Sequence, residues 1–457
     1  MEDIISLQNP WKRGQPALAG KILPRKILPL IEAWLDEPEI IVIKGARQTG
    51  KTTIQYHLID QLLQRGVKPE NVFYFLLDNL TLQQRFSEHP YVLKQTIEKF
   101  LGQPLEKHGQ RIYLFLDEIQ KLRQFSTQVK EYFDLFPNMK FILSGSSILQ
   151  ASASISESLR GRTISFTVTP FSLGEVMPHI PACTLANLQD WETIQQHHAA
   201  TLPHKSEILL HLNQHLVFGS MPRIHLSQTD SQRQMRLAEY IDTFMRKDII
   251  ETLRVAKFLD FEKLLRLLSF QVGNVVNISE LATRTQLSTE TIRKYLTLGE
   301  EAFIFQFVAP FFSNKRKSLV KDRKIYFEDL GIRNHLAGQD SLNLLNHPDL
   351  GGEAENFVHI TLGKYGENNK HRFREYFFKS YRGQEVDFII EMNGDLIPIE
   401  VKYQNQLRRR DYDHLLMFME DFDLNKGLLV TKDLFDRRMF DDRGVILVPL
   451  WLFATIV

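Results

Sequence analysis

A nine-residue segment of the chain combines glycine, lysine and threonine at spacings that suit phosphate binding. It fits the pattern G-x-x-x-x-G-K-[ST] and reads Gly45-Ala46-Arg47-Gln48-Thr49-Gly50-Lys51-Thr52-Thr53. An apolar run at 39–43 predicts a buried strand before it, and the residues from Ile54 onward predict a helix. Backbone N–H groups and the positive end of that helix would converge on phosphate oxygens. We expect Lys51 to reach the β- and γ-phosphates of a nucleotide and Thr52 to bind Mg²⁺.

Two adjacent carboxylates follow a second apolar run. Residues 112–116 are strand-forming and lead directly into Asp117 and Glu118, which is typical of a buried strand in a parallel sheet. Asp117, at the carboxyl end of that strand, could hold Mg²⁺ through a water molecule. Glu118 could orient or deprotonate the water that attacks the γ-phosphate.

Further polar candidates follow the next strand. Residues 141–143 run into Ser144-Gly145-Ser146-Ser147, and the hydroxyl of Ser146 is a candidate sensor of the γ-phosphate. Arg160 and Arg162 lie in the following loop, where a guanidinium could contact the γ-phosphate in the same subunit or in a neighbour. Arg162 is the stronger candidate, and a role in a neighbour requires a ring or a dimer. A polar turn and a solvated basic loop are the alternatives.

Strands and helices alternate around these residues, which predicts an α/β fold with a doubly wound parallel sheet. The expected strands are 39–43, 72–77, 112–117, 140–144 and 163–168, and the expected helices are 51–65, 89–102 and 122–135. Ligands bind at the carboxyl ends of such strands, where all these motifs fall. Residues 1–20 are expected to form an irregular arm, and residues 22–35 a helix.

Length and composition limit what else the chain can be. A chain of 457 residues is too long for one core. Its 56 basic residues nearly balance 55 acidic ones, so nucleic-acid binding would have to be local. The single cysteine, Cys183, excludes an intramolecular disulfide and a cysteine-rich zinc site. The N-terminus lacks the apolar core of a signal peptide, and the apolar tail at 447–457 is too short to span a bilayer. We expect a cytoplasmic protein with no membrane partner.

The middle of the chain predicts helices followed by a helix-turn-helix. Residues 172–256 read as helical, and the histidines within 180–205 show no metal-ligand spacing. Helices are expected at 240–253, 258–270, 278–282 and 289–298, with Ser288 as a cap. Exposed Thr289, Arg293 and Lys294 could contact a DNA groove, and strands at 303–308 and 324–327 with a basic tip at 314–317 could form a wing. Docking of a protein partner stays open as the alternative.

The last hundred residues place two carboxylates and a lysine on neighbouring strands. The expected order is a helix at 352–363, strands at 373–378, 386–391 and 396–401, a helix at 411–420 and a strand at 427–431. Asp387 interrupts an apolar run, and Glu400 and Lys402 share one face of the third strand. The carboxylates could hold Mg²⁺, with Glu355 as an extra ligand, while Lys402 positions water. An inward salt bridge is the alternative, and the nearby arginines 408–410 could contact a nucleic-acid backbone.

Several of these segments, in the same order, resemble the bacterial and archaeal AAA-type ATPases whose C-terminal half was long described as a domain of unknown function. The resemblance covers nearly the whole chain and rests on residues 45–53, 116–120, 143–147, 159–162, 169–172, 218–222, 246–249 and 324–331. Asp387, Glu400 and Lys402 resemble the signature of the PD-(D/E)xK nucleases. The resemblance implies ATP binding, a helical lid, a winged helix and a nuclease-like C-terminal fold.

The expected organisation therefore has five parts: an arm at 1–20, an AAA-type P-loop ATPase core at 21–175, a helical lid or insertion at 176–256, a winged helix at 257–345 and a small α/β nuclease-like domain at 346–457. The expected activity is hydrolysis of ATP with Mg²⁺, coupled to a metal-dependent nuclease-like DNA-binding domain whose cleavage of DNA is left open. The alternatives are a nucleotide-driven DNA-binding switch with an inactive nuclease fold, and an ATPase whose winged helix docks protein partners.

Overall fold

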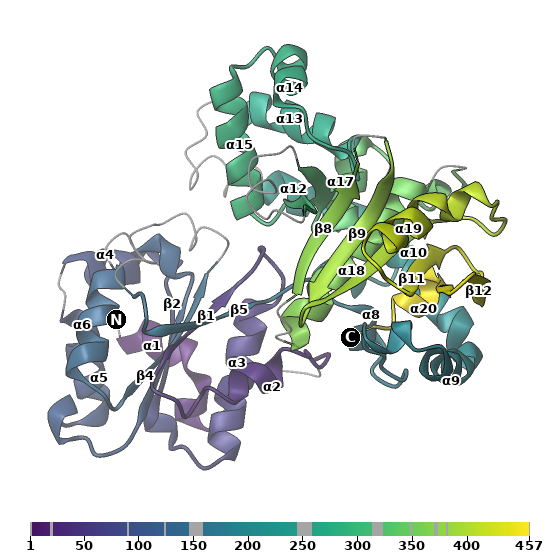
Figure 1. Ribbon diagram of the computed structural model, residues 1–457. Helices are drawn as coiled ribbons and strands as arrows, with labels where there is room; N and C mark the ends of the chain where they lie inside the picture. Colours follow the sequence, from purple (N-terminus) through teal and green to yellow (C-terminus); the bar gives the residue numbers. More distant parts are fainter. Residues whose placement is uncertain are drawn as a thin grey trace. The chain divides into compact units, whose positions relative to one another are not determined.

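The computed structural model divides into two compact units, Met1–Thr169 and Pro170–Val457 (Figure 1). The residues that it describes are 2–18, 22–88, 91–122, 125–145, 159–244, 258–312, 323–347, 350–369, 373–380 and 383–456. Ser146, the segment 246–249 and the basic run 314–317 lie outside these ranges. The boundaries expected near 256 and 345 fall inside the second unit.

A five-stranded parallel sheet with the order β2-β3-β4-β1-β5 forms the centre of the first unit. Its strands are β1 (Ile40–Lys44), β2 (Val72–Leu76), β3 (Ile112–Asp117), β4 (Met139–Gly145) and β5 (Thr163–Thr167). Strands β3 and β4 are buried along their whole length, as expected for central strands that are covered on both faces. All five strands expected in this unit are confirmed.

Helices cover both faces of this sheet, which confirms the doubly wound arrangement (Figure 1). In β1, Ile41 and Ile43 pack with one set of helices and Ile40 with the other, as the period of two along a strand requires. The first set is α2 (Leu28–Glu32) and α3 (Lys51–Gln64), and the second is α1 (Glu2–Gln8), α4 (Leu80–Glu88), α5 (Val92–Leu101) and α6 (Phe125–Leu135).

Two expectations for the first unit are wrong, and a helix was missed. The N-terminal residues form helix α1 rather than an irregular arm, because Ile5 is buried in the core. The helix expected over 22–35 is reduced to α2. Pro24 disfavours a helical residue before it, and Pro29 is compatible only with the first turn. Helix α4 was not predicted.

The second unit begins with a helical region, as the sequence predicts. Its helices are α8 (Leu173–Val176), α9 (Trp191–Thr201), α10 (Lys205–Phe218), α11 (Pro222–His225), α12 (Asp230–Thr243), α13 (Phe258–Ser269), α14 (Ile278–Thr285), α15 (Thr289–Glu301) and α17 (Leu330–Ala337). The expected cap is present, since Ser288 Oγ accepts the N–H of Thr291 at 3.1 Å. Among the described helices, none has the length and hydropathy to cross a bilayer.

An eight-stranded mixed sheet, in the order β12-β13-β11-β10-β9-β8-β6-β7, completes the second unit. Strands β8, β9 and β10 are antiparallel neighbours, whereas β10, β11 and β13 run parallel. The bounds are β6 (Phe305–Pro310), β7 (Lys324–Phe327), β8 (Phe373–Lys379), β9 (Glu385–Met392), β10 (Asp395–Lys402), β11 (Lys426–Thr431), β12 (Asp436–Phe440) and β13 (Arg443–Pro449), with helices α18 (Gly351–Asn369), α19 (Arg410–Asp421) and α20 (Leu450–Phe453).

Strand β6 links the expected wing to the C-terminal sheet. Its first residues pair antiparallel with β7, and Ala309 and Pro310 pair in parallel with β8. The outer side of β7 is also hydrogen-bonded. Ile325 N–H donates to Asn274 O at 3.2 Å and Ile325 O accepts the Gly273 N–H at 3.0 Å. The Asn356 amide of α18 bonds both backbone groups of Phe327, at 2.8 and 2.7 Å.

A buried carboxylate joins the end of α10 to the start of α17. Asp329 accepts the N–H groups of Gly331 at 2.9 Å and Ile332 at 3.3 Å as the cap of α17. It also accepts the Ser220 N–H at 2.7 Å. A Cβ at Gly219 would lie 1.8 Å from Asp329 Oδ1, so this approach of the two segments requires glycine at 219.

We expect Asp329→Ala to destabilise the second unit by about 2–4 kcal/mol, because three N–H groups lose a buried acceptor. Asn277 offers a matched control, since it accepts the N–H groups of Ser279 and Glu280 at the exposed start of α14. Asn277→Ala should cost about 1 kcal/mol. Urea denaturation followed by tryptophan fluorescence measures both losses, and equal losses would contradict the role of burial.

Candidate functional site

The glycine-rich loop lies between the carboxyl end of β1 and the first turn of α3. Gly50 has φ +98° and immediately precedes Lys51, the first residue of α3. Gly45 has φ +148°, and a Cβ there would lie 2.3 Å from Val168 O. The two glycines therefore allow a tight turn that a side chain would prevent. The loop opens at the edge of the sheet where parallel strands end and where ligands bind.

Lys51 is buried and turns back into this loop. Its ammonium donates hydrogen bonds to Gly45 O at 3.0 Å and to Ala46 O at 2.8 Å. The hydroxyl of Thr49 donates to the same Ala46 oxygen at 2.9 Å. The positive charge is thus held at the mouth of the phosphate-binding loop, where an incoming phosphate could replace the carbonyl oxygens.

Arg25 supports the loop from outside, which the sequence did not indicate. Its guanidinium donates to Thr49 O at 2.7 Å and to Thr169 O, and so joins the loop to the segment after β5. Arg25 lies in the segment that was expected to be helical, and no spacing connects it with the glycine motif. The one available signal was the neighbouring Pro24, which predicts an irregular backbone at this point rather than a helix.

Asp117, at the carboxyl end of β3, is fully buried and accepts four hydrogen bonds. One oxygen accepts the Thr52 hydroxyl at 2.6 Å and the Tyr74 hydroxyl at 2.8 Å. The other accepts the Glu118 N–H at 3.0 Å and the Ser144 hydroxyl. Thr52 and Asp117 are therefore brought together as the magnesium prediction requires. A hydroxyl beside a carboxylate suits Mg²⁺, for which Thr52 would supply a direct ligand and Asp117 a water-mediated one.

Tyr74 of β2 was not predicted as part of this site. Burial, followed by the negative charge of Asp117, raises the pKa of the Tyr74 hydroxyl, so this group remains a hydrogen-bond donor. The sequence signal was ambiguous, because an aromatic residue in an apolar strand usually belongs to the core. Its position on the strand next to β3 was the available clue.

Glu118 follows Asp117 in a left-handed backbone conformation, with φ 60° and ψ 43°. The amide of Gln120 donates to its carboxylate. Burial raises the pKa of Glu118, although the nearby charge of Lys51 acts in the opposite direction. A carboxylate with a raised pKa is a better proton acceptor near neutral pH than an ordinary glutamate.

Arg162 lies at the opposite end of the sheet from the phosphate loop. Its carbonyl oxygen accepts the N–H of Ile40, the first residue of β1, at 2.8 Å. The five residues of β1 then separate it from the loop by roughly 16 Å. Its guanidinium pairs with Asp134 at 3.0 Å. This position does not fit a γ-phosphate contact within the same subunit, and the role in a neighbouring subunit stays a prediction.

In the second unit, β9 and β10 bring together the three residues of the predicted nuclease signature. The Val401 N–H donates to Asp387 Oδ2 at 2.9 Å, and the Asp387 N–H donates to Glu400 Oε2 at 3.3 Å. The Lys402 ammonium contacts Glu400 Oε1. Burial, followed by the charge of Asp387, raises the pKa of Glu400 to about 8.

Glu355 of α18 joins this cluster, as predicted, but two unpredicted residues of β7 accompany it. Glu355 Oε1 accepts the Tyr326 hydroxyl at 2.6 Å and lies 3.1 Å from Lys324 Nζ. Burial and the charge of Asp387 raise the pKa of Glu355 to about 7. Lys324 and Tyr326 are two positions apart on β7 and so share a face. Lys324 and Tyr326 were not assigned to this cluster from the sequence, because residues 324–327 were predicted only as a strand of the winged helix.

The exposed basic residues of the second unit lie outside this cluster. Thr289, Arg293 and Lys294 are exposed on α15, and so are the three arginines 408–410 at the start of α19. The Arg409 guanidinium lies over the Phe440 ring, 4.6 Å from its centroid, which is a contact within the protein itself.

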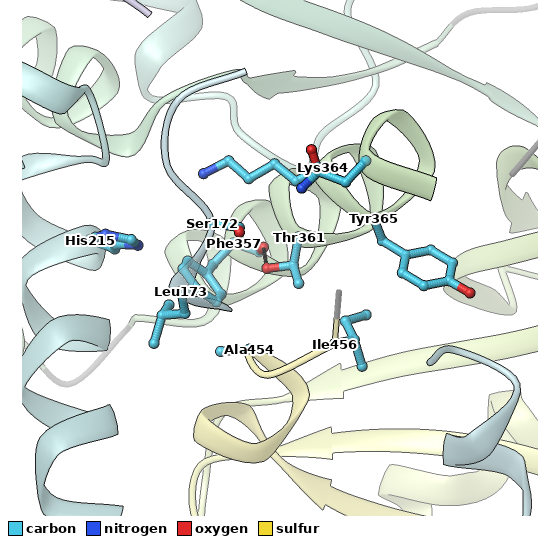
Figure 2. A pocket seen from close by; sticks show the side chains of 10 residues that line it. Ser172, Leu173, His215, Phe357, Thr361, Lys364, Tyr365, Ala454 and Ile456 are labelled. Carbon is cyan, nitrogen blue, oxygen red and sulfur yellow. Dashed lines mark hydrogen bonds between the residues drawn. The ribbon is translucent and has the colours of Figure 1, made fainter. Parts of the chain in front are cut away.

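Two other features were considered as binding sites. His179, His204 and Glu207 place their ligand atoms within 4.8 Å of one another on the surface, although an ion pair of His179 with Glu207 at 3.1 Å also explains this arrangement. A small cavity lies between α10, α18 and the C-terminal residues (Figure 2). The space open to water there is about 10 Å³, enough for one water molecule and too small for a substrate.

Comparisons with known proteins give a family match for the part of the chain that contains the glycine-rich loop. Residues 37–177 match the AAA domain family, whereas residues 209–343 and 350–453 match two domains of unknown function, DUF8612 and DUF4143. An uncharacterized protein of Haemophilus influenzae is 23% identical over 424 residues, covering 91% of this chain and 95% of its own. An uncharacterized protein of Methanocaldococcus jannaschii is 24% identical over 438 residues, covering 93% and 90%.

Among solved structures, the Walker-type ATPase of Pyrococcus abyssi aligns with a TM-score of 0.41 and 15% identity, covering 69% of this chain and 96% of that one. The Hsp104–ADP complex of S. cerevisiae aligns with a TM-score of 0.30 and 14% identity, covering 64% and 40%. The segment that matches the AAA domain family, residues 37–177, contains the glycine-rich loop, Asp117 and Glu118.

We expect Tyr74→Phe to destabilise the first unit by about 1.5–3 kcal/mol, because a buried hydrogen bond to the Asp117 carboxylate is lost. Tyr113→Phe is the matched control on the neighbouring strand, since its hydroxyl lies 3.4 Å from the exposed Asp36. That change should cost less than about 1 kcal/mol. Thermal unfolding of both variants without nucleotide measures the difference. A smaller loss for Tyr74→Phe than for Tyr113→Phe would show that the Tyr74 hydroxyl does not stabilise the site.

Proposed function

We propose that the first unit hydrolyses ATP, with Mg²⁺, to ADP and inorganic phosphate. The observation that supports this most directly is the convergence of Lys51, Thr52, Asp117 and Glu118 at the carboxyl ends of β1 and β3. These residues supply a cation for the phosphates, two groups that suit Mg²⁺ and a carboxylate with a raised pKa.

The residues have separate roles in this proposal. Backbone N–H groups of residues 45–53 bind the phosphates, and Lys51 offsets the charge on the β- and γ-phosphate oxygens. Bound Mg²⁺ supplies further charge neutralisation. Glu118 accepts the proton of a water molecule as its oxygen bonds to the γ-phosphorus. The bond from that phosphorus to the bridging oxygen breaks, and ADP leaves with the electron pair.

A contact of Arg162 with the γ-phosphate requires a second copy of the chain. Its place at the amino ends of β1 and β5, away from the loop of its own subunit, supports this proposal. In a dimer or ring, release from Asp134 would free the guanidinium for a neighbour's nucleotide. This assembly is part of the proposal.

Lys51→Ala should abolish ATP binding, because the charge within the loop is lost. Glu118→Gln should retain binding while kcat falls by about 10²-fold or more, because the water loses its proton acceptor. Steady-state phosphate release and binding of a fluorescent ATP analogue separate these effects. Unchanged turnover in Glu118→Gln would remove this glutamate from the mechanism.

The same assay, run over a range of protein concentrations, tests the proposed assembly. Activity per chain should rise with concentration, and Arg162→Ala should lower kcat. Asp134→Ala is the control, because it removes the partner of Arg162 within the subunit but leaves the guanidinium available. Equal loss in both variants would indicate a structural role for the ion pair.

A second candidate activity, metal-dependent cleavage of DNA, is favoured by the meeting of Asp387, Glu400 and Lys402. The two carboxylates and Glu355 are oxygen ligands of the type that Mg²⁺ prefers. Lys402 would position water or offset charge on the scissile phosphate. Exposed Arg293 and Lys294 on α15 would contact the DNA in the manner of a winged helix.

Lys402→Ala should lower cleavage of single- or double-stranded DNA at least about 10²-fold. The assay uses full-length protein with Mg²⁺ or Mn²⁺, with and without ATP, and Lys51→Ala shows whether nucleotide binding controls cleavage. Lys379→Ala is the control, because this exposed lysine contacts Glu385 from outside the cluster at 2.9 Å. Cleavage that survives Lys402→Ala would come from elsewhere.

Two other outcomes lead to the alternative functions. Salt-sensitive DNA binding without cleavage would favour a nucleotide-driven DNA-binding switch with an inactive nuclease fold. ATP hydrolysis without any salt-sensitive DNA affinity would favour docking of a protein partner by α14 and α15.

A further inference from the structure

Lys324 extends from β7 into the middle of the acidic cluster. Its ammonium lies 2.7 Å from Glu385 Oε1, 3.1 Å from Glu355 Oε1 and 3.5 Å from Asp387 Oδ1. The lysine side chain is only 1% exposed. These carboxylates come from helix α18 and strand β9, and the cation comes from a strand that sequence analysis assigned to a wing.

This burial is stable only because the charges compensate one another. An unpaired ammonium or carboxylate is costly away from water. Burial lowers the pKa of Lys324, but the charges of Glu355, Asp387 and Glu385 more than offset this and leave the pKa raised. The three carboxylates within 3.5 Å therefore compensate the buried ammonium of Lys324.

Protein donors also contact the second oxygen of Asp387 and both oxygens of Glu400. Asp387 Oδ2 accepts the Val401 N–H, Glu400 Oε1 contacts Lys402 and Glu400 Oε2 accepts the Asp387 N–H. A divalent cation would have to bind several of these same carboxylate oxygens at about 2.0–2.6 Å. It would then lie beside the ammonium of Lys324, and the two positive charges would repel each other.

We propose that Lys324 occupies the place of a divalent metal and holds the nuclease-like site in a closed, metal-free form. The inference rests on the proposed role of Asp387 and Glu400 as metal ligands. Because Lys324 belongs to β7, this strand supplies the inhibiting cation. Withdrawal of the Lys324 side chain from these carboxylates would admit the metal and so permit cleavage.

Binding of Mn²⁺ to the full-length protein without nucleotide tests this proposal, with the paramagnetic resonance of free Mn²⁺ as the readout. Wild type should show no site that Asp387→Asn removes. Lys324→Met should gain one Mn²⁺ site. If wild type has a weak Asp387-dependent site, the site in Lys324→Met should bind Mn²⁺ at least tenfold more tightly. The double variant Lys324→Met/Asp387→Asn should lose the site. Lys379→Met, which removes an exposed lysine beside the same Glu385, should gain none.

Removal of Lys324 leaves buried carboxylates without a cation, so a second variant guards against misfolding. Lys324→Met/Glu385→Gln removes one of these charges and keeps Asp387, Glu355 and Glu400. It should also gain the Mn²⁺ site, and Mn²⁺ should raise its unfolding temperature.

Two results would overturn the inference. One is an Asp387-dependent Mn²⁺ site in wild type that is as tight as in Lys324→Met, which would leave the proposed nuclease standing. The other is a folded Lys324 variant that gains no site. If Lys324→Met binds Mn²⁺ but does not cut DNA, the inference holds and the proposed nuclease activity fails.

Discussion

A carboxylate that is removed from water needs hydrogen-bond donors or a cation, and this requirement organises both units. In the first unit, Asp117 is satisfied by groups from α3, β2 and β4 and by the next N–H of its own chain. In the second, Asp329 joins α10 to α17, and the Asp387 cluster joins α18, β7, β9 and β10. Each carboxylate fixes elements that are distant in sequence, so the candidate sites coincide with the polar connections of the fold.

The two acidic sites differ in how the charge is compensated. Three side-chain hydroxyls surround Asp117, and a hydroxyl solvates the carboxylate without cancelling its charge. A negative charge therefore remains on Asp117, as the proposed binding of Mg²⁺ requires. The cluster around Asp387 instead contains the ammonium of Lys324, which neutralises charge within the protein itself. Neutral donors thus compensate the buried carboxylate in one unit, and a lysine ammonium does so in the other.

Much of the first site could be predicted from sequence, because its residues lie in contiguous motifs. The bounds of β3 follow from an unbroken apolar run that ends at Asp117, and the loop follows from its glycines. Tyr74 and Arg25 could not be predicted, since their roles depend on which strands become neighbours. Lys324 is the clearest case, because it is 31 residues from Glu355 and only the pairing of β7 reveals the contact.

The sheet of the second unit was also only partly predictable. Strands β8 to β11 follow from periodicity. The end of β13 and all of α20 were missed because the apolar tail at 447–457 was considered only as a membrane segment, and β12 was missed because its charged sequence has no apolar run. The apolar tail is instead buried, with β13 parallel to β11. A boundary between a winged helix and a C-terminal domain was expected near 345. The strands on the two sides of this point belong to one sheet, because β6 pairs with both β7 and β8.

Strand β7 ends the eight-stranded sheet, and on its outer side the backbone groups of Ile325 and Phe327 already have hydrogen-bond partners. An end strand normally presents a template on which the strand of another molecule can form. Here the segment at 273–274 and the Asn356 amide already use those backbone groups. Growth of the sheet by strand addition is therefore blocked at β7, and a partner that binds by this mode would have to add at β12, whose Arg437 is exposed.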